Sequence, residues 1–323
     1  MTAVCYVIEG EITCRSPLHI GSGERLGVVK RTRRYIPGSV LRGTFGLALL
    51  KLVCDNSAQP AKCYEGCARV KECPYPRLFG LKPPRAIFRF AYPLCECGGV
   101  LRPAPMDLYE CDRGHIRATL DVRPTCTECG SPMRRLEGYY CESCGKAIRE
   151  PVSILRLTRT AIDRSRLAHS EVIHEEFGLR LPPAGTLHSL EAIGEGSRFK
   201  LEVLMDAECS DLCKTVIYVL ERGVPDEGLG GDRSVGLGDV EVRVREVKSV
   251  SEGELYRRAS RLGYDFKLRL LSPAIAGLEP STILEAARKA YTWAYGGGTP
   301  RLPSVKLGSL RTLTEAWSRW SLA

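Results

Sequence analysis

The stretch that decides the fold runs from residue 197 to residue 247. It reads SRFKLEVLMDA (197–207), SDLCKTVIYVLERG (210–223) and GLGGDRSVGLGDVEVRVREV (228–247). Apolar residues that mostly alternate predict strands in the first and last runs, and the amphipathic middle run predicts a helix that stops at Gly223. The expected order is therefore strand, helix, glycine-rich loop and strand.

The N-terminal segment also predicts a strand followed by a helix. VCYVIEGEITC (4–14) predicts a strand, and Ser39 is expected to be the N-cap of a helix over VLRGTFGLALLKLV (40–53). TLHSLEAIG (186–194) predicts a further strand, which a Glu-Gly pair separates from the 197–207 run, as in a hairpin. The order β-α-insertion-β-β-α-β predicts an α+β fold of the ferredoxin-like or RRM-like type.

These patterns divide the chain into three expected parts. Residues 1–53 and 151–250 form the RRM-like domain, and residues 54–150 form an inserted zinc-binding module. Residues 251–323 contain another strand-like run, FKLRLLSPAIAG, and another helical run, STILEAARKAYTWAYGGG. We expect this last part to be a partial second RRM-like domain.

Cysteine spacing predicts two zinc sites in the insertion. Eleven of the 15 cysteines lie between Cys54 and Cys144. The clearest pattern is a pair of CxxC motifs, each followed by glycine, and four thiolates from two tight turns make a closed tetrahedral site. We group the expected ligands as Cys126, Cys129, Cys141 and Cys144 in one site, and as Cys95, Cys97, Cys111 and His115 in the other. Disulfides are the main alternative, and His115 alone is also consistent with a surface histidine.

A third set of cysteines has irregular spacing. It consists of Cys54, Cys63, Cys67 and Cys73. Zinc, an iron–sulfur cluster and free core thiols are all consistent with it. None of the three sets predicts a catalytic metal, because each can fill four positions with protein ligands and leave none open for water.

Composition indicates a globular protein with affinity for anions. The chain has 323 residues, a formal net charge of +9 and only 12 Lys among its 47 basic residues. The excess of Arg, whose planar donors match phosphate, favours nucleic acid as a partner. Asn56 and Gln59 are the only amide side chains, which is typical of thermophiles. The absence of a long apolar run or a signal peptide argues against a membrane and predicts a cytoplasmic protein.

Two glycine-rich loops and one helix start are the candidate phosphate-binding features. A glycine-rich turn can form a nest of backbone N–H groups around an anion, and a helix N-terminus offers free N–H groups. A basic loop precedes the first helix. The candidate RNA-binding residues are Gly21, Gly23, Lys30, Arg31, Arg33, Arg34, Ser39, Arg42, Arg159, Arg164, Gly230, Gly231, Arg233, Ser234, Gly236 and Gly238. Ordinary solvated loops and structural turns are the alternative explanation for each group.

Three motifs in this order resemble the RAMP superfamily of CRISPR effector proteins. They are SPLHIGSG (16–23), YIPGSVLRG (35–43) and GGDRSVGLG (230–238), and TRTAIDR (158–164) adds to the resemblance. It implies an RRM-like subunit that binds CRISPR RNA in a type III complex, beside other RAMP subunits and a large subunit. Subunits that cut target RNA are implied to carry an aspartate before the second motif, where this chain has only Glu24. The resemblance therefore favours the noncatalytic cap subunit that grips the 5′ handle, as in type III-D complexes.

Two other functions remain open. The first is a metal-independent endoribonuclease of the same superfamily that processes precursor CRISPR RNA, for which His19 is the candidate catalytic residue. The other available histidines are His169, His174 and His188. The second is a zinc-ribbon adaptor with no role in RNA binding, which would leave both glycine loops unexplained.

Overall fold

The computed structural model describes residues 3–26, 29–54, 71–80, 84–105, 107–119, 121, 123–160, 162–163, 168–169, 172–174, 179–181 and 187–259. The fold is α+β, with several mainly antiparallel sheets and few helices. Its strands are β1 (Ala3–Cys14), β2 (Gly21–Leu26), β3 (Val29–Thr32), β4 (Ala86–Phe88), β5 (Leu101–Pro103), β6 (Leu108–Cys111), β7 (Ile116–Ala118), β8 (Met133–Arg135), β9 (Tyr139–Cys141), β10 (Ala147–Ile148), β11 (Ile154–Thr160), β12 (Ile162–Asp163), β13 (Ala168–His169), β14 (Val172–His174), β15 (Leu179–Leu181), β16 (Leu187–Ile193), β17 (Arg198–Asp206) and β18 (Val240–Ser251). The helices are α1 (Gly38–Val53), α2 (Pro74–Phe79), α3 (Cys213–Tyr218), α4 (Val224–Glu227) and α5 (Glu252–Ala259).

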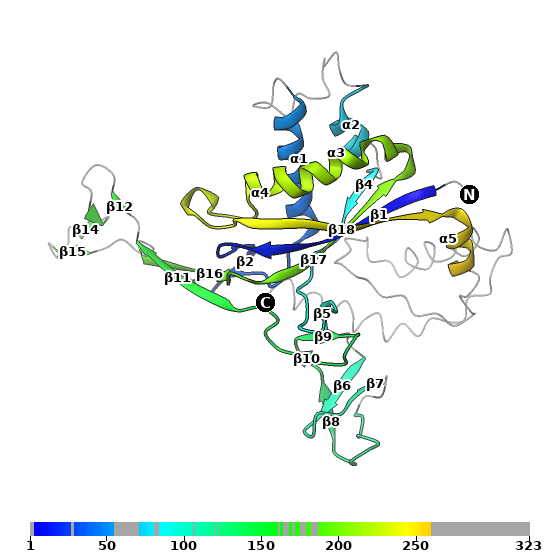
Figure 1. The fold of residues 1–323 in the computed structure, drawn as a ribbon. Helices are drawn as coiled ribbons and strands as arrows, with labels where there is room; N and C mark the ends of the chain where they lie inside the picture. Colours follow the sequence, from blue (N-terminus) through cyan, green and yellow to red (C-terminus); the bar gives the residue numbers. More distant parts are fainter. Residues whose placement is uncertain are drawn as a thin grey trace, which may run out of the picture.

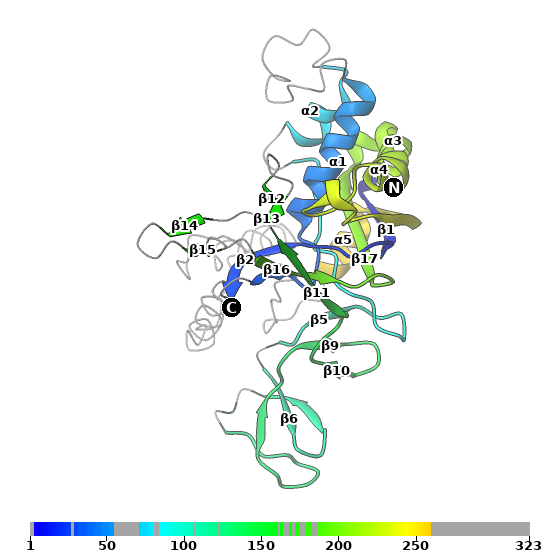
Figure 2. The ribbon, with the colours of Figure 1, turned by 90° about the vertical axis from the view of Figure 1, so that its left-hand side faces the viewer.

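The main sheet has the strand order β18-β1-β17-β4, and every neighbouring pair is antiparallel. Helices α1, α2, α3 and α4 lie on one side of it, as Figures 1 and 2 show. The strands alternate as their sequences predict: Ile8 and Ile12 of β1, and Phe199, Leu201 and Val203 of β17, are completely buried toward the helices. The charged residues between them occupy the opposite face.

An aromatic cluster joins the helices to the edge of this sheet. Phe45 of α1 lies 5.0 Å from Phe88 of β4 and 6.0 Å from Phe79 of α2, measured between ring centroids. All three side chains are buried. Burial of one such ring stabilises the fold by roughly 1.5–3 kcal/mol. Residues 74–80 and 84–91, which lie in the segment expected to be an insertion, therefore contribute to the main core, and the inserted part that projects from it begins only after them.

The expected hairpin between residues 186–194 and 197–207 was wrong. Strands β16 and β17 follow one another in the chain but belong to different sheets. Between them Gly196 has φ +78°, and its N–H donates to Cys14 O at 2.8 Å. The short loop is thus a corner where the chain changes sheets. The strand that pairs with β17 at this edge of the main sheet is instead β4. Its three residues are too few to show an alternating pattern in the sequence.

Both helix boundaries that were expected at a capping residue also differ. The first helix begins at Gly38 after Pro37, and Ser39 lies within its first turn. Gly38 packs so closely that a Cβ there would lie 2.1 Å from Phe88 O. In the later helix, Gly223 has helical dihedrals and packs on Ala48. Successive 3₁₀, α and π turns carry the helical run from residue 207 to Glu227, and Gly228, at φ +69°, ends it.

A second sheet has the order β11-β16-β3-β2. Strand β16 pairs with β3 in parallel and with β11 antiparallel. Lys30 and Arg31 therefore belong to a strand, and only Arg33 and Arg34 of the expected basic loop lie outside it. Leu190 and Ala192 of β16 pack with Leu237 in a small core of their own.

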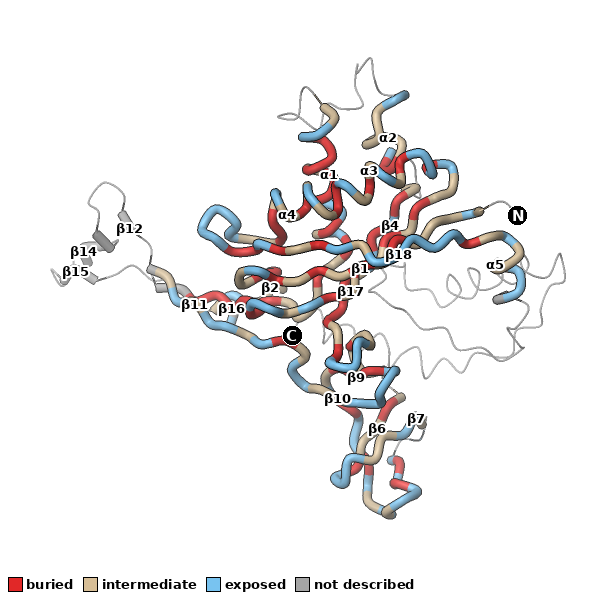
Figure 3. Tube along the Cα trace, viewed as in Figure 1, coloured by how far each residue is buried: buried red, intermediate tan, exposed pale blue. Residues whose placement is uncertain are grey.

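Strands β5–β10 form a separate module. It extends from the main sheet on the side opposite the helices (Figures 1 and 2). Two three-stranded sheets build it, β10-β9-β5 and β7-β6-β8. Figure 3 shows buried residues concentrated in the main sheet and its helices, whereas the module has only short buried stretches. Such small cores need additional stabilisation from metal or disulfides.

The expected C-terminal domain at residues 251–323 lies outside the described residues, except for α5 and the end of β18. Among the described residues, no helix is both long and apolar enough to cross a lipid bilayer.

Candidate metal centres and nucleic-acid interface

Eight side chains of the module gather in two groups. One group is Cys95, Cys97, Cys141 and Cys144, and the other is Cys111, His115, Cys126 and Cys129. Within each group the possible ligand atoms all lie within 4.8 Å of one another. Each group offers four protein ligands, so both could hold a metal ion in a closed, structural site.

The first group has the dimensions of a zinc site. Cys95 Sγ lies 3.8 Å from Cys144 Sγ, and Cys97 Sγ lies 3.6 Å from Cys141 Sγ. Four sulfurs at the usual Zn–S distance of about 2.3 Å would be about 3.8 Å apart in a tetrahedron. Gly99 donates its N–H to Cys97 Sγ at 3.4 Å, as amides commonly do to thiolate ligands.

The second group places the histidine ring between sulfurs. His115 Nδ1 lies 3.5 Å from Cys111 Sγ and 3.4 Å from Cys126 Sγ, while Cys129 Sγ lies 3.7 Å from Cys111 Sγ. These separations match one nitrogen at about 2.0 Å and three sulfurs at about 2.3 Å from a common zinc ion. The other ring nitrogen, Nε2, lies 3.2 Å from Glu128 Oε2. A carboxylate in this position orients the ring and makes it a better ligand.

The grouping expected from the sequence was wrong, although the same eight residues are involved. The two CxxC motifs do not face each other, because β8 and β9 between them belong to different sheets. Strand β9 pairs with β5, which places Leu101 opposite Cys141 and so brings Cys95 and Cys97 to the second motif. Strand β6 pairs with β8, which places Cys111 opposite Met133 and near the first motif. The second group is thus nested inside the first.

Local hydrogen bonds favour the thiolate form of two ligands. Those from Ser131 lower the pKa of Cys129 to about 6. Burial opposes ionisation of Cys141, but the amides of Cys144 and Ser143 outweigh it, and its pKa falls to about 7. Thiolates are the form that binds zinc. The third cysteine set lies partly outside the described residues: Cys54 follows α1 and Cys73 precedes α2, and Cys63 and Cys67 are not described.

The two glycine-rich motifs meet in space. Gly231 N–H donates to His19 O at 2.9 Å, and Gly238 N–H donates to Pro17 O at 2.9 Å. Ser16 Oγ accepts from the Asp239 N–H at 2.9 Å. Segments that lie more than 200 residues apart in the chain therefore form one continuous loop surface, which includes Gly21 and Gly23 at the start of β2.

A third motif joins this surface through an ion pair. Arg159 of β11 lies 3.1 Å from the carboxylate of Asp232. Asp232 has φ +59°, an unusual conformation for a residue other than glycine, and belongs to the second glycine-rich motif. Arg164 of the same motif as Arg159 lies outside the described residues.

Most amides of the second glycine loop are already used within the chain. The amides of Val235, Gly236 and Leu237 donate to the carbonyls of Asp232 and Arg233, in addition to the two bonds of Gly231 and Gly238. Arg233 itself donates to Glu227 O at 2.9 Å. A nest over the whole loop is therefore not available. The exposed tip, residues 232–236 with Ser234 at its centre, is the part that a phosphate can approach.

The basic residues before α1 have different surroundings. Lys30 is exposed, whereas Arg31 pairs with Glu24 at 3.6 Å. Arg33 donates to Ser22 O at 3.1 Å and to Tyr35 Oη at 3.0 Å. Arg34 forms a two-bond pair with Glu150, which raises the pKa of Arg34. Lys30 is therefore the residue of this group best placed to meet a phosphate.

The start of the first helix is only partly available. Ser39 is exposed but makes no capping hydrogen bond, and the guanidinium of Arg42 lies 5.1 Å from the ring centroid of Phe79. Arg42 thus packs on the aromatic cluster and is turned along the helix surface.

His19 is nearly buried beneath the joined loops. Its Nδ1 lies 2.7 Å from the backbone carbonyl oxygen of Glu191, and 9% of the residue is exposed. A carbonyl oxygen can only accept, so Nδ1 carries the proton and Nε2 is left as the basic nitrogen in the neutral ring. The side chains of His169, His174 and His188 lie outside the part that the structure describes.

One cluster of basic residues was not predicted. Arg89, Arg102 and Lys200 come together with two aromatic residues around a small pocket. The three are separated by up to 111 positions and do not cluster in the sequence, so no local pattern marks them. Only the pairing of β17 with its neighbours brings them to one place.

Comparisons with known proteins give distant similarities. A sequence model described as the AF_1859_N N-terminal domain matches residues 33–94. A search of curated proteins finds no match. A chain from the "Type III-B Cmr-beta Cryo-EM structure of the Apo state" is 16% identical with a TM-score of 0.40, covering 74% of this chain and 97% of its own length. A chain from the "Cryo-EM structure of the Type III-B Cmr-beta bound to cognate target RNA" is also 16% identical with a TM-score of 0.40, covering 73% and 96%.

Proposed function

We propose that this chain is a RAMP-type subunit that binds CRISPR RNA in a type III effector complex, where it grips the 5′ handle without cutting it. The observation that carries the proposal is the contact among three motifs: Gly231 and Gly238 bond to the 16–23 loop, and Arg159 pairs with Asp232. Their contact places all three motifs at one surface, as a shared RNA-binding site requires. Other RAMP subunits and a large subunit are the protein partners that this function implies.

The topology supports a ferredoxin-like or RRM-like frame. After β1 the chain forms β2 and β3 of the second sheet and then α1, and another helical run follows β17. In the main sheet β1 lies between β17 and β18. This is the order of a βαββαβ unit in which β4 is the second strand. We assign residues 1–53 and 151–250 to this frame, together with residues 74–80 and 84–91, which pack in its core.

We infer that both metal centres hold zinc. The interatomic distances fit a four-ligand zinc ion in each group, and no ligand position is left for water or substrate. The ligands hold the module in shape, so zinc here is structural. RNA binding through the loops of the RRM-like domain does not need zinc as a reactant.

Binding of labelled CRISPR RNA tests the RNA proposal. Ser234→Glu would place a carboxylate at the exposed loop tip, where repulsion of phosphate should weaken binding about tenfold. Ser210→Glu is a matched control, because it makes the same change of charge at an exposed site in the helical run after β17. RNA with and without the 5′ handle should be compared by filter binding. Equal effects of the two substitutions, or no binding by the unaltered protein, would favour the zinc-ribbon adaptor.

A second candidate function is RNA cleavage by His19. The hydrogen bond from Nδ1 to Glu191 O leaves Nε2 in the form that a general base needs. Incubation of precursor CRISPR RNA with the protein in EDTA separates the two functions. Cleavage at one position that is lost in His19→Ala would establish the nuclease, whereas binding of intact RNA supports the noncatalytic subunit.

A further inference from the structure

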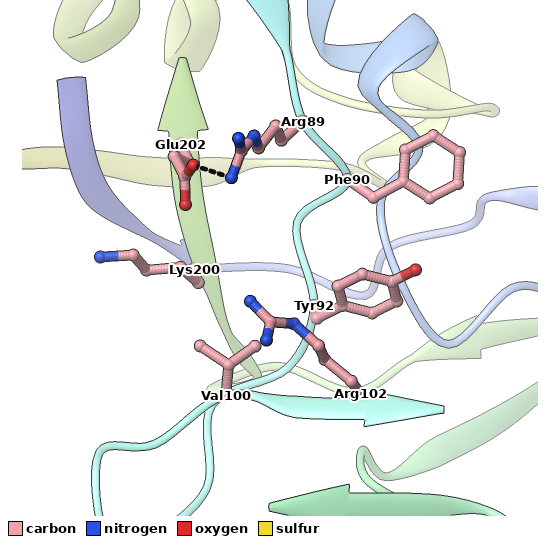
Figure 4. A pocket seen from close by; sticks show the side chains of 7 residues that line it. All are labelled: Arg89, Phe90, Tyr92, Val100, Arg102, Lys200 and Glu202. Carbon is pink, nitrogen blue, oxygen red and sulfur yellow. Dashed lines mark ion pairs between the residues drawn. The ribbon is translucent and has the colours of Figure 1, made fainter. Parts of the chain in front are cut away.

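A small pocket lies where the main sheet meets the zinc module. It has a volume of about 140 Å³ and is lined by Arg89, Phe90, Tyr92, Val100, Arg102, Lys200 and Glu202. Figure 4 shows that Lys200 and Glu202 come from β17, and that Arg102 reaches from β5 of the module toward that strand. The pocket is therefore built by both parts of the molecule.

Backbone hydrogen bonds hold the two walls together. Lys200 N–H donates to Tyr92 O at 2.9 Å, and Leu94 N–H donates to Arg198 O at 2.8 Å. Directly after this segment comes Cys95, whose N–H donates to Gly99 O at 2.7 Å in the first metal-binding turn. The position of Val100 and Arg102 thus depends on the shape of the first metal centre.

The wall carries an excess of positive charge. Three cationic side chains face one carboxylate, Glu202, which pairs with Arg89. Lys200 pairs at 2.6 Å with Glu9, outside the pocket. Burial raises the pKa of Tyr92 to about 12, so its hydroxyl adds no negative charge at neutral pH. With Arg89 and Lys200 already paired, Arg102 is the cation through which the pocket favours an anionic group.

Arg102 provides the clearest sign that an acceptor is missing. Its Nε is buried and has no hydrogen-bond partner among the described residues. One of its terminal nitrogens only reaches Glu142 at 3.5 Å. A buried guanidinium donor without an acceptor costs more free energy than a donor in water, so such groups in native proteins usually have a partner.

We propose that this pocket binds a phosphate group, with Arg102 as the main contact and Arg89 and Lys200 beside it. Arginine donates parallel hydrogen bonds to phosphate oxygens, and a turn of the guanidinium toward the pocket would let Nε take part in them. The volume equals that of about five water molecules and is less than half of the roughly 300 Å³ at which whole small-molecule sites begin. A phosphate therefore fits, with the rest of its molecule outside. The phosphate can belong to the backbone of single-stranded RNA or to a small phosphate compound.

Two binding measurements on the full-length, zinc-loaded protein separate these sources. Equilibrium dialysis with labelled inorganic phosphate tests the free anion, and filter binding of a 12-nucleotide oligouridylate without a handle tests RNA. Arg102→Gln removes the guanidinium and its positive charge. It should weaken binding about tenfold in whichever of the two measurements uses the natural source of the phosphate. Arg117→Gln, at an exposed position of β7, removes the same charge away from the pocket and should change binding less than twofold.

Zinc content and thermal melting must be the same in both variants. If Arg102→Gln does not fold, Arg102→Lys and Lys200→Gln replace it, and each should still weaken binding more than Arg117→Gln. Loss of phosphate binding in Arg102→Gln, with no RNA binding by any variant, would support the pocket and contradict the RNA function. RNA binding that is equal in both variants, with no binding of phosphate, would overturn the pocket and leave the RNA function standing.

Discussion

Single glycines in the 228–238 loop have different tasks. Gly238, at φ +82°, packs against the backbone so closely that a Cβ would lie 2.0 Å from Leu229 O. Gly236, at φ +86°, is exposed and has nothing within 4 Å of that position. Gly231 lies between these cases, with His19 Cδ2 3.4 Å away. The loop therefore combines glycines that close packing requires with one that only the backbone conformation requires.

This difference predicts unequal effects of alanine. Gly236→Ala should reduce the free energy of unfolding by about 1 kcal/mol, the usual cost of a positive φ in alanine. Gly238→Ala should cost at least about 3 kcal/mol, because the backbone of Leu229 must also move. Urea unfolding followed by circular dichroism would measure both. Equal losses would mean that the loop rearranges easily and that the close contact is not required.

The basic residues before α1 also differ in what their removal should do. If RNA phosphates contact this strand, Lys30→Ala should reduce the salt dependence of binding by about 0.7 in log–log slope, the value for one phosphate on a single strand. Arg34→Ala should change that slope less and lower thermal stability more, because it breaks the two-bond pair with Glu150. RNA titrations at several salt concentrations would show the slopes. The reverse ranking would place the RNA over Arg34.

At the scale of elements, the module shows how strand pairing selects metal ligands. Strands β5 and β9 close an outer ribbon, and the inner ribbon of β6, β7 and β8 is inserted between them. The ligands of the first metal centre therefore flank those of the second in the sequence. Loss of the inner centre should leave the outer one in place, because each ribbon pairs only with itself.

Zinc counting by native mass spectrometry tests this nested arrangement. Cys126→Ser with Cys129→Ser should lose one zinc ion, and adding Cys141→Ser should lose the second. If the two CxxC motifs shared one ion, the third substitution would release none. The unaltered protein, measured after the same metal loading, is the control.

Glu128 should affect the inner centre without being a ligand. Glu128→Gln keeps the size of the side chain but removes the charge beside His115 Nε2, and zinc affinity at that site should fall by about 10- to 100-fold. Competition with a chelator would measure the affinity. Glu142→Gln, on the outer ribbon, is the comparison, and an equal fall in both variants would show that general charge is responsible.

At the scale of the whole molecule, the face of the main sheet opposite the helices carries a network of ion pairs. Glu9 of β1 pairs with Lys200 of β17 at 2.6 Å and with Lys248 of β18 at 3.2 Å. Glu11 lies between Arg198 and Arg245 in the same way. Each carboxylate thus links three strands. This face offers paired charges, so the aromatic stacking of RNA bases seen on many RRM-type sheets has no counterpart among these residues.

The network predicts a loss of stability in acid. The hydrogen bond from Lys200 lowers the pKa of Glu9 below its ordinary value of 4.5, although burial opposes it. A lowered pKa in the folded state stabilises the protein above pH 4.5, and this contribution disappears as the pH falls through the lowered pKa. Glu9→Gln should therefore be about 1 kcal/mol less stable at pH 7, and this difference should disappear as the pH falls through the lowered pKa.

Urea unfolding at pH 7 and at an acidic pH below 4.5 would measure this difference. Glu195→Gln, in the exposed turn between β16 and β17, serves as the control and should not change stability at either pH. A constant difference between Glu9→Gln and the unaltered protein across the pH range would show that Glu9 acts through packing.

The sequence alone determined those features that depend on neighbours in the chain. Alternating apolar residues located β1, β17 and β18, and thiolate spacing identified all eight residues of the two metal centres. The α+β class follows from the same patterns. Each of these rests on a local period or a tight turn, which a short stretch of chain encodes completely.

Only the tertiary structure decided which distant segments meet. Three residues were enough to make β4 a strand because β17 offers it a free edge. Gly223 continues the helical run at a place where Ala48 lies so close that a Cβ would not fit. The division of the eight ligands depends on whether β9 pairs with β8 or with β5. Such choices are set by the packing of surfaces far apart in the chain, and the free energy of that packing is not contained in the pattern of any one segment.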